Sequence, residues 1–187
     1  MAKADHKETM IISGNAQKAL KILHLLAVCF WVGGALCELL LYYISSSAES
    51  GGELFGIMRG TRFVSLYVVV YLGAFGSFFT GLAYSLCTHR GFFRHKWIII
   101  KWATTIYMIA CGFMFLGGWG AELAEKAYFL GLAALDDPAY MAIRTKLLFT
   151  VSGHMVLFII LTAISVYKPW ETKEAIRLLN KKLRVEK

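Results

Sequence analysis

The sequence predicts an all-α integral membrane protein, a bundle of four transmembrane helices with both termini in the cytoplasm. Three observations support this prediction. Hydrophobic residues make up 58% of the 187-residue chain and the mean hydropathy is +0.58, which is too apolar for a water-soluble domain. The apolar residues are gathered in four long segments. The basic residues lie mostly outside these segments, so the formal charge of +8 indicates contact with anionic lipid rather than nucleic acid.

Each of the four apolar segments is long enough to cross the bilayer as a helix. We place them at about 19–44, 64–87, 97–119 and 147–167. A helix needs about 20 apolar residues to cross the hydrocarbon core, and lipid offers no partner for the backbone groups of an open strand. The chain is therefore predicted to form a single transmembrane domain.

The charges between the spans predict the orientation. Lysine and arginine are frequent before the first span, between the second and third spans, and in the C-terminal tail. These three segments lie on one side if four helices cross the membrane. The other two loops, 45–63 and 120–146, carry fewer uncompensated basic residues. Because cytoplasmic loops are enriched in lysine and arginine, both termini are predicted to be cytoplasmic.

Two segments outside the spans are predicted to be helical. Residues 120–135 indicate a short interfacial helix on the outer face, and the Asp-Asp-Pro sequence at 136–138 is typical of a helix start leading into the fourth span. The tail at 170–187 places apolar residues on one helical face and basic residues on the other. This pattern predicts an amphipathic cytoplasmic helix on the inner leaflet.

Ionisable side chains within the apolar spans are the candidates for a functional site. His24 and Glu38 interrupt the first span. Lys101 lies near the start of the third span, and His154 lies within the fourth. A titratable group in hydrocarbon is costly, so such residues generally serve a function. Trp31 falls on the same face of the first helix as His24 and Glu38, at spacings of three and four residues.

The depth of these residues limits which of them can meet. At about 1.5 Å per residue, His24 lies roughly 8 Å inside the cytoplasmic end, and Lys101 enters from the same side. His154 lies roughly 10 Å from the opposite face, closer to the depth of Glu38. The spacing leaves open a His24–Lys101 site, a His154–Glu38 site, and a site in which the two histidines face each other.

Histidines in a helical bundle are typical axial ligands of haem, which makes haem the favoured cofactor. We assign His24, Lys101, His154, Trp31 and Glu38 to cofactor binding, with His24 and His154 as the metal ligands. Simpler roles remain open. A membrane histidine can hydrogen-bond a neighbouring helix, a lysine can extend to the interface, and a buried carboxyl group can be protonated or paired with histidine. The four cysteines and most glycines are typical packing residues.

Three motifs carry a resemblance to a known family. KALKILHLLAVCFWVGGAL in the first span, GFFRHKWIIIKW at the start of the third and SVYKPW at the end of the fourth resemble a group of bacterial integral membrane proteins of unknown function. That group is similar to HemJ-type protoporphyrinogen oxidases and to the membrane domain of CopD-type copper-resistance proteins. In HemJ-type proteins a histidine in a KxLH motif and a lysine near the start of a later span are associated with haem b. The resemblance implies these roles for His24 and Lys101, and a location in the bacterial inner membrane.

Three functional hypotheses follow. The preferred one is a haem b protein that transfers electrons, with His24 as one iron ligand, His154 or Lys101 as the second, and a quinol as a candidate donor. A second is a HemJ-like oxidase that acts on the porphyrin precursor protoporphyrinogen. A third is a transporter of copper or another metal, in which Glu38, His154 and methionines line a path. The sequence leaves open whether the bundle forms a homodimer.

Overall fold

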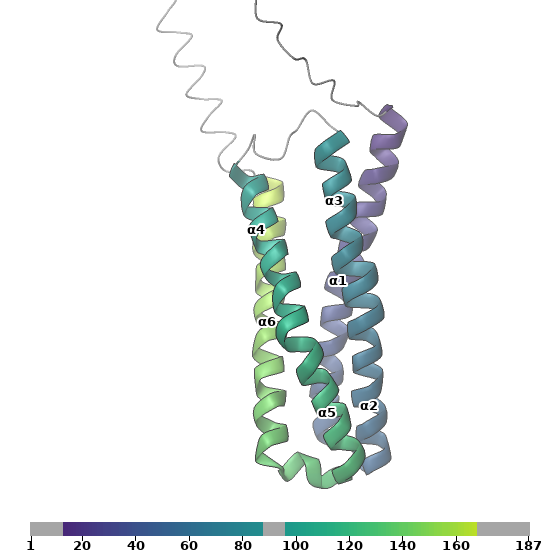
Figure 1. Ribbon diagram of the computed structural model, residues 1–187, viewed down its shortest axis with the longest axis vertical. Coiled ribbons are helices and arrows are strands. Elements are labelled where there is room, and N and C mark those ends of the chain that lie inside the picture. The colour runs from purple at the N-terminus through teal and green to yellow at the C-terminus, as the bar shows by residue number, and fades with distance from the viewer. Residues whose placement is uncertain (1–12, 88–95, 168–187) are drawn as a thin grey trace, which may run out of the picture.

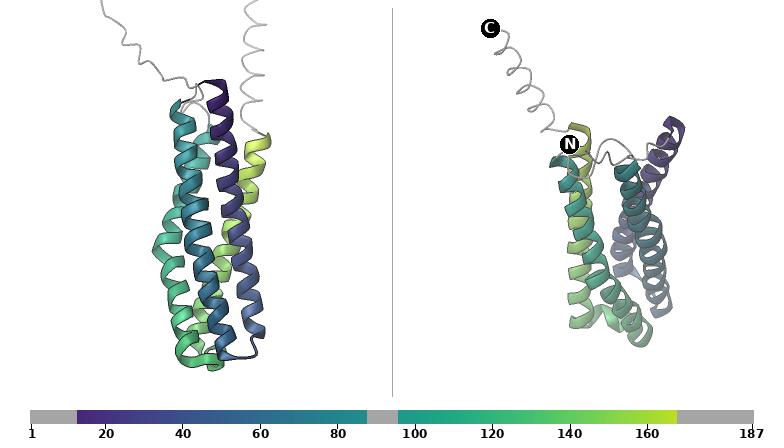
Figure 2. Two further views of the ribbon diagram at one scale, coloured as in Figure 1. Left: turned by 90° about the vertical axis from the view of Figure 1, so that its right-hand side faces the viewer. Right: turned by 45° about the horizontal axis from the view of Figure 1, so that its top comes forward.

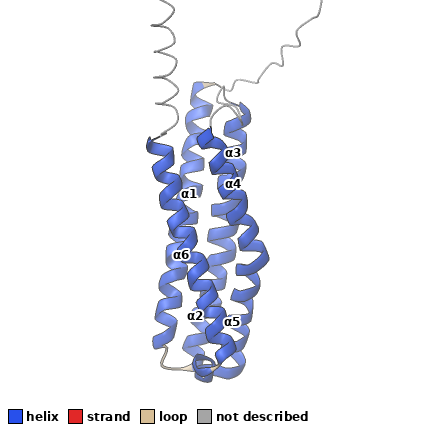
Figure 3. Cartoon of the chain, turned by 90° about the vertical axis from the view of Figure 1, so that its left-hand side faces the viewer, coloured by secondary structure: helices blue, strands red, loops and turns tan. Residues whose placement is uncertain are grey.

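The computed structural model describes residues 13–87 and 96–167, and these form four long helical rods (Figure 1). Short turns join the first rod to the second and the third rod to the fourth. All four rods are long and apolar enough to cross a membrane. The regular structure in this part of the chain is entirely helical (Figure 3). The predicted all-α bundle with four spans is confirmed to this extent. The predicted tail helix at 170–187 lies outside the described residues.

The rods differ in how many helical segments they contain. The first comprises α1 (Gly14–Ile44) and a 3₁₀ turn, η1 (Ser45–Ser47). The second comprises α2 (Gly51–Phe63), a π-helical stretch η2 (Val64–Phe75) and α3 (Gly76–Cys87). The third comprises α4 (Lys96–Cys111), a π-helical stretch η3 (Gly112–Leu116), α5 (Gly117–Leu130) and the 3₁₀ segment η4 (Gly131–Asp136). The fourth is α6 (Pro138–Tyr167) alone.

The two ends of the bundle are built differently. We call the end where α1 begins and α6 finishes the terminal end, and the opposite end the turn end (Figure 1). Along the bundle α1 packs on η2 and α3, and α4 packs on α6. At the turn end α5 packs on both α2 and α6. Toward the terminal end the α1/α3 pair and the α4/α6 pair diverge (Figures 1 and 2).

The rods are longer than the membrane requires. The second rod has 37 residues, which corresponds to about 55 Å of helix, whereas the hydrocarbon core is about 30 Å thick. The additional length at the turn end has a core of its own, which includes Leu54, Leu123 and Tyr140, each fully buried. This core packs α2, α5 and the start of α6 against one another.

Two expectations from the sequence are corrected at this end. Residues 45–63 are not simply a loop, because α2 occupies most of this segment and runs on into the second span. Residues 120–135 do not form a separate interfacial helix, because α5 continues the third rod from η3. The physical reason is that the apolar faces of α2 and α5 pack on each other, so neither needs to lie flat on lipid.

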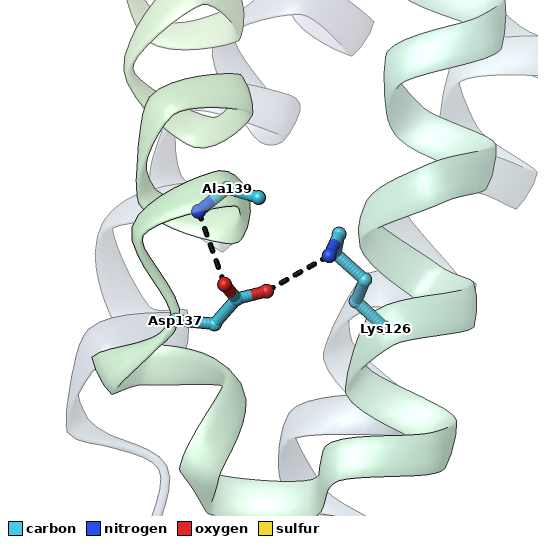
Figure 4. Close-up of polar contacts among 3 residues, drawn as sticks. All are labelled: Lys126, Asp137 and Ala139. Atoms are coloured by element: carbon cyan, nitrogen blue, oxygen red, sulfur yellow. Dashed lines mark hydrogen bonds and ion pairs between the residues drawn. The ribbon is translucent and has the colours of Figure 1, made fainter.

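The predicted helix start at Asp137 and Pro138 is confirmed (Figure 4). The backbone N–H of Ala139 donates to Asp137 Oδ1 at 3.1 Å, and Lys126 Nζ donates to Asp137 Oδ2 at 2.8 Å. The first contact satisfies an N–H group of the opening turn of α6. The second joins α5 to α6, so Asp137 links the third and fourth rods. The fourth helix therefore starts well before the predicted span, and it continues without a break to Tyr167.

Two glycines bring the first and second rods into close contact. A Cβ atom at Gly73 would lie 2.6 Å from Trp31 Cα, and one at Gly34 would lie 2.6 Å from Val69 Cγ2. Neither position has room for a side chain. This close approach holds α1 against η2 over the part of the bundle that carries Trp31 and Glu38.

The outward surface of the rods is apolar. Phe149 is 77% exposed, and many other large apolar side chains also face outward, including Leu72 and Ile159. In a water-soluble protein so much exposed apolar surface would be unstable. Its presence along four long apolar helices indicates contact with the lipid bilayer.

Candidate functional sites

The ionisable side chains in the bundle fall into two groups at different depths. His24 and Lys101 lie in the terminal half, on α1 and α4. Glu38 and His154 lie closer to the turn end, on α1 and α6. We call the first group the terminal site and the second group the chamber site.

His24 is hydrogen-bonded to α3 in the terminal site. His24 Nδ1 is 2.9 Å from Thr80 Oγ1, and the Thr80 hydroxyl group is 2.6 Å from the carbonyl oxygen of Gly76, to which it can donate. A threonine hydroxyl has one hydrogen, so in the tautomer with the proton on Nδ1 it accepts from the imidazole and donates to Gly76. In that tautomer the lone pair of Nε2 is free to bind a metal ion.

The backbone of α3 allows this arrangement. A Cβ atom at Gly81 would lie 3.3 Å from His24 Cε1, tighter than most real Cβ contacts. The absence of a side chain at Gly81 therefore lets the imidazole lie directly against α3. Thr80 and Gly81 act together, one by binding the ring and the other by leaving space for it.

Lys101 is half-buried and close enough to His24 for the two side chains to interact electrostatically. Its Nζ atom also lies 5.8 Å from the centroid of the Trp97 ring, one turn closer to the terminal end. The side chain therefore has a cation–π contact within its own helix. The structure places Lys101 within electrostatic range of His24, in the same half of the bundle.

The chamber site surrounds a cavity of about 220 Å³. Glu38 and His154 both line it and are only 4% and 7% exposed. Within the described part of the chain, Glu38 Oε1 and His154 Nε2 have no hydrogen-bond partner. The Ser65 hydroxyl group of η2 also lines the cavity and interacts with the Glu38 carboxyl group. Glu38 and His154, each with one unpaired polar atom, thus line the same cavity.

Aromatic contacts position the side chains around this cavity. Trp31, predicted to share a face with Glu38, lines the cavity and packs edge-on against Phe158 with 5.1 Å between ring centroids. The His154 ring packs edge-on against Tyr107 at 6.5 Å. Met108, which is 2% exposed, lines the wall formed by α4. Arg62 and Tyr42 also line the cavity, and most of the remaining lining is apolar.

The structure does not bring His24 and His154 together. Because α1 and α6 are antiparallel and Trp31 contacts Phe158, His154 is level with about residue 35 of α1. His24 lies about 16 Å farther along the helix axis. A metal–imidazole bond is only about 2 Å long, so the two rings cannot bind one iron in this arrangement.

Thr80 and Gly81 were missed by reasoning from sequence. A usable signal was present in the second span, where Gly73, Gly76, Ser77 and Thr80 recur at spacings of three and four or as neighbours. Small and hydroxyl side chains on one helical face are typical of a contact with another transmembrane helix. The spacing alone does not identify the helix that faces these residues, which the structure shows to be α1.

Neither a cluster of metal-binding side chains nor similarity to known proteins assigns a function to the described residues. Among residues 13–87 and 96–167, no group of three or more His, Cys, Asp or Glu residues could hold a metal ion. Comparisons with protein-family models, curated proteins and solved structures found no match. A functional assignment therefore depends on the chemistry of the two sites.

Proposed function

We propose that the protein binds haem b at the terminal site and takes part in electron transfer across or along a bacterial inner membrane. His24 Nε2 is the axial iron ligand in this proposal. The observation that supports it is the hydrogen bond between His24 Nδ1 and Thr80 Oγ1, which leaves Nε2 free to bind iron when the ring proton is on Nδ1. The terminal end is the cytoplasmic side, since the basic segments predicted to be cytoplasmic adjoin it.

The residues of the terminal site fit the requirements of a haem ligand. Histidines that bind metals almost always donate their second ring N–H to a protein acceptor, which fixes the tautomer and the ring orientation. Thr80 fills this role for His24. The Lys101 amine is the candidate for the second axial position, because His154 is too distant. When bound, haem b supplies a one-electron redox centre.

The remaining residues of this site prepare it for the cofactor. Thr80 holds the imidazole plane in one orientation, and Gly81 gives the ring room against α3. His24 lies on α1 and Lys101 on α4, and the α1/α3 and α4/α6 pairs diverge toward this end of the bundle (Figure 1). The resemblance of KILH and WIIIKW to haem-associated motifs supports the same pair of residues.

A set of variants read by absorption spectroscopy tests this proposal. His24→Ala should abolish the Soret band of the purified protein, whereas Cys29→Ala, an exposed change one turn along the same helix, should leave it unchanged. Thr80→Val should weaken haem retention by about 10- to 100-fold, as expected for loss of a group that orients a ligand. Thr80→Ser keeps the hydroxyl group and should restore binding. Normal haem content in His24→Ala would overturn the assignment.

The HemJ-like alternative needs its own experiment, because haem binding is common to both hypotheses. An oxidase of this type should restore growth to a strain that lacks its own protoporphyrinogen oxidase. No feature of the described structure favours this activity over electron transfer alone.

A further inference from the structure

The chamber site has features of a ligand site that the haem proposal does not use. Glu38 and His154 are each more than nine-tenths buried, and each presents an unpaired polar atom. Buried polar groups are nearly always hydrogen-bonded, since an unpaired group costs several kcal/mol in an apolar setting. Two unpaired atoms at one cavity indicate a ligand that pairs with both. We propose that this cavity binds the head ring of a membrane-soluble quinol or quinone.

The size of the cavity selects a single ring. Its volume is about 220 Å³. An apolar protein cavity of about 150 Å³ is known to hold benzene, so the chamber accommodates one six-membered ring with small substituents. A porphyrin, with four pyrrole rings in one macrocycle, is too large. The chamber and the terminal site therefore take different ligands.

The polarity of the cavity selects oxygen substituents. A carboxyl group and an imidazole can each donate or accept a hydrogen bond, depending on protonation. They can therefore pair with either the hydroxyl groups of a quinol or the carbonyl groups of a quinone. Most of the remaining wall is apolar, with Trp31, Met108 and Phe113 among its members. Arg62 also lines the cavity, so a cationic ligand would lose its hydration there beside a positive charge.

The position of the cavity favours entry from the bilayer. Two of its lining residues, Leu66 on η2 and Phe113 on η3, are 41% and 61% exposed on the apolar outer surface. The part of the cavity wall between η2 and η3 is therefore in contact with lipid. Both stretches are π-helical, a rare geometry that is frequent at functional sites. A ring attached to an isoprenoid or alkyl tail can enter here and leave its tail in the membrane.

Two glycines of the third rod provide a matched test. A Cβ atom at Gly112 or at Gly118 would meet nothing within 4 Å, so both positions accept a larger side chain. Gly112 lines the cavity, whereas Gly118 is exposed and does not. Gly112→Leu therefore fills the chamber while Glu38 and His154 stay in place. Gly118→Leu makes the same change on the outer surface.

The assay is photolabelling of the full-length protein in lipid vesicles with an azido derivative of decylubiquinone. Saturable labelling of η2 or η3 peptides is expected, with competition by decylubiquinone but not by decylbenzene, which lacks the oxygens. Gly112→Leu should abolish this labelling and Gly118→Leu should retain it. Glu38→Gln and His154→Phe should each weaken the competition by about tenfold, the loss expected for one hydrogen bond.

Several results would overturn the inference. Labelling that is equal in Gly112→Leu and Gly118→Leu would show that the probe only partitions into lipid. Equal competition by decylbenzene would show that the cavity takes apolar chains without recognising oxygen. Displacement of the probe by Zn²⁺ alone, lost in Glu38→Gln, would identify a metal site instead. The inference is independent of haem binding, and the Soret band of each variant separates its failure from failure of the proposed function.

Discussion

Replacing Gly73 with alanine should force the first and second rods apart. The new Cβ atom would lie 2.6 Å from Trp31 Cα and 2.8 Å from Trp31 N. Both are backbone atoms, so no side-chain rotation can relieve the overlap. Carbon atoms pack best at about 3.5–4.0 Å, so α1 must move away from η2 by about 1 Å.

The expected cost follows from this displacement. Overpacking of a tight contact typically costs about 1–3 kcal/mol, and alanine recovers about 0.5–1 kcal/mol through its higher helix propensity. We therefore expect a net destabilisation centred on about 1 kcal/mol, within a range of roughly 0 to 2.5 kcal/mol. Gly33 is the control, because it lies on the exposed face of α1 and its Cβ atom would meet nothing within 4 Å. Gly33→Ala should be neutral or slightly stabilising.

Unfolding by sodium dodecyl sulfate in mixed micelles, followed by far-ultraviolet circular dichroism, measures this difference. The midpoint for Gly73→Ala should shift to a lower detergent fraction, and that for Gly33→Ala should not. If the two variants unfold together with the wild type, the close approach of α1 and η2 is not required for stability. The reasoning about this helix contact would then be refuted.

Three further predictions concern the turn end. Ser50→Ala removes the side chain that accepts from Glu53 N at 3.1 Å at the start of α2, and should cost about 1 kcal/mol in the same titration, whereas Ser50→Asp should preserve stability. The hydrogen bond from Lys126 holds the pKa of the Asp137 carboxyl group below its usual range. This stabilisation is complete above the unfolded-state pKa of about 3.9 and is lost as the pH falls through the folded-state pKa. Thermal unfolding at a series of acidic pH values should therefore show a fall in the unfolding temperature that is smaller in Asp137→Asn. Leu54→Ala, at a fully buried position, should cost about 2–5 kcal/mol by thermal unfolding, and a loss below 1 kcal/mol would contradict the packed turn-end core.

The four membrane helices could be predicted because their signal is local. Each span is a run of apolar residues long enough to cross hydrocarbon, and such a run has few other stable conformations. The continuation of two rods into α2 and α5 could not be predicted in this way. Residues 51–63 include glycines and charged side chains that lower the hydropathy of this segment. Its helical conformation therefore depends on packing against the rest of the bundle. Its buried Leu54 and Met58 share a core with Leu123 of α5.

Sequence position indicated the depth of the candidate residues but not the direction in which each side chain points. Counting helical rise left three pairings open, and the pair assigned as metal ligands, His24 and His154, lies far apart in the bundle. Which side of a helix faces which neighbour depends on the packed bundle. The adjacent residues Gly33 and Gly34 illustrate the difference, since the first is exposed and the second is pressed against Val69.

The unequal construction of the two ends has a mechanical consequence. The rods are clamped at the turn end by a packed core and by the Lys126–Asp137 contact, whereas the helix pairs diverge at the terminal end. A change in the spacing of the α1/α3 and α4/α6 pairs can therefore be absorbed at the terminal end while the clamp stays intact.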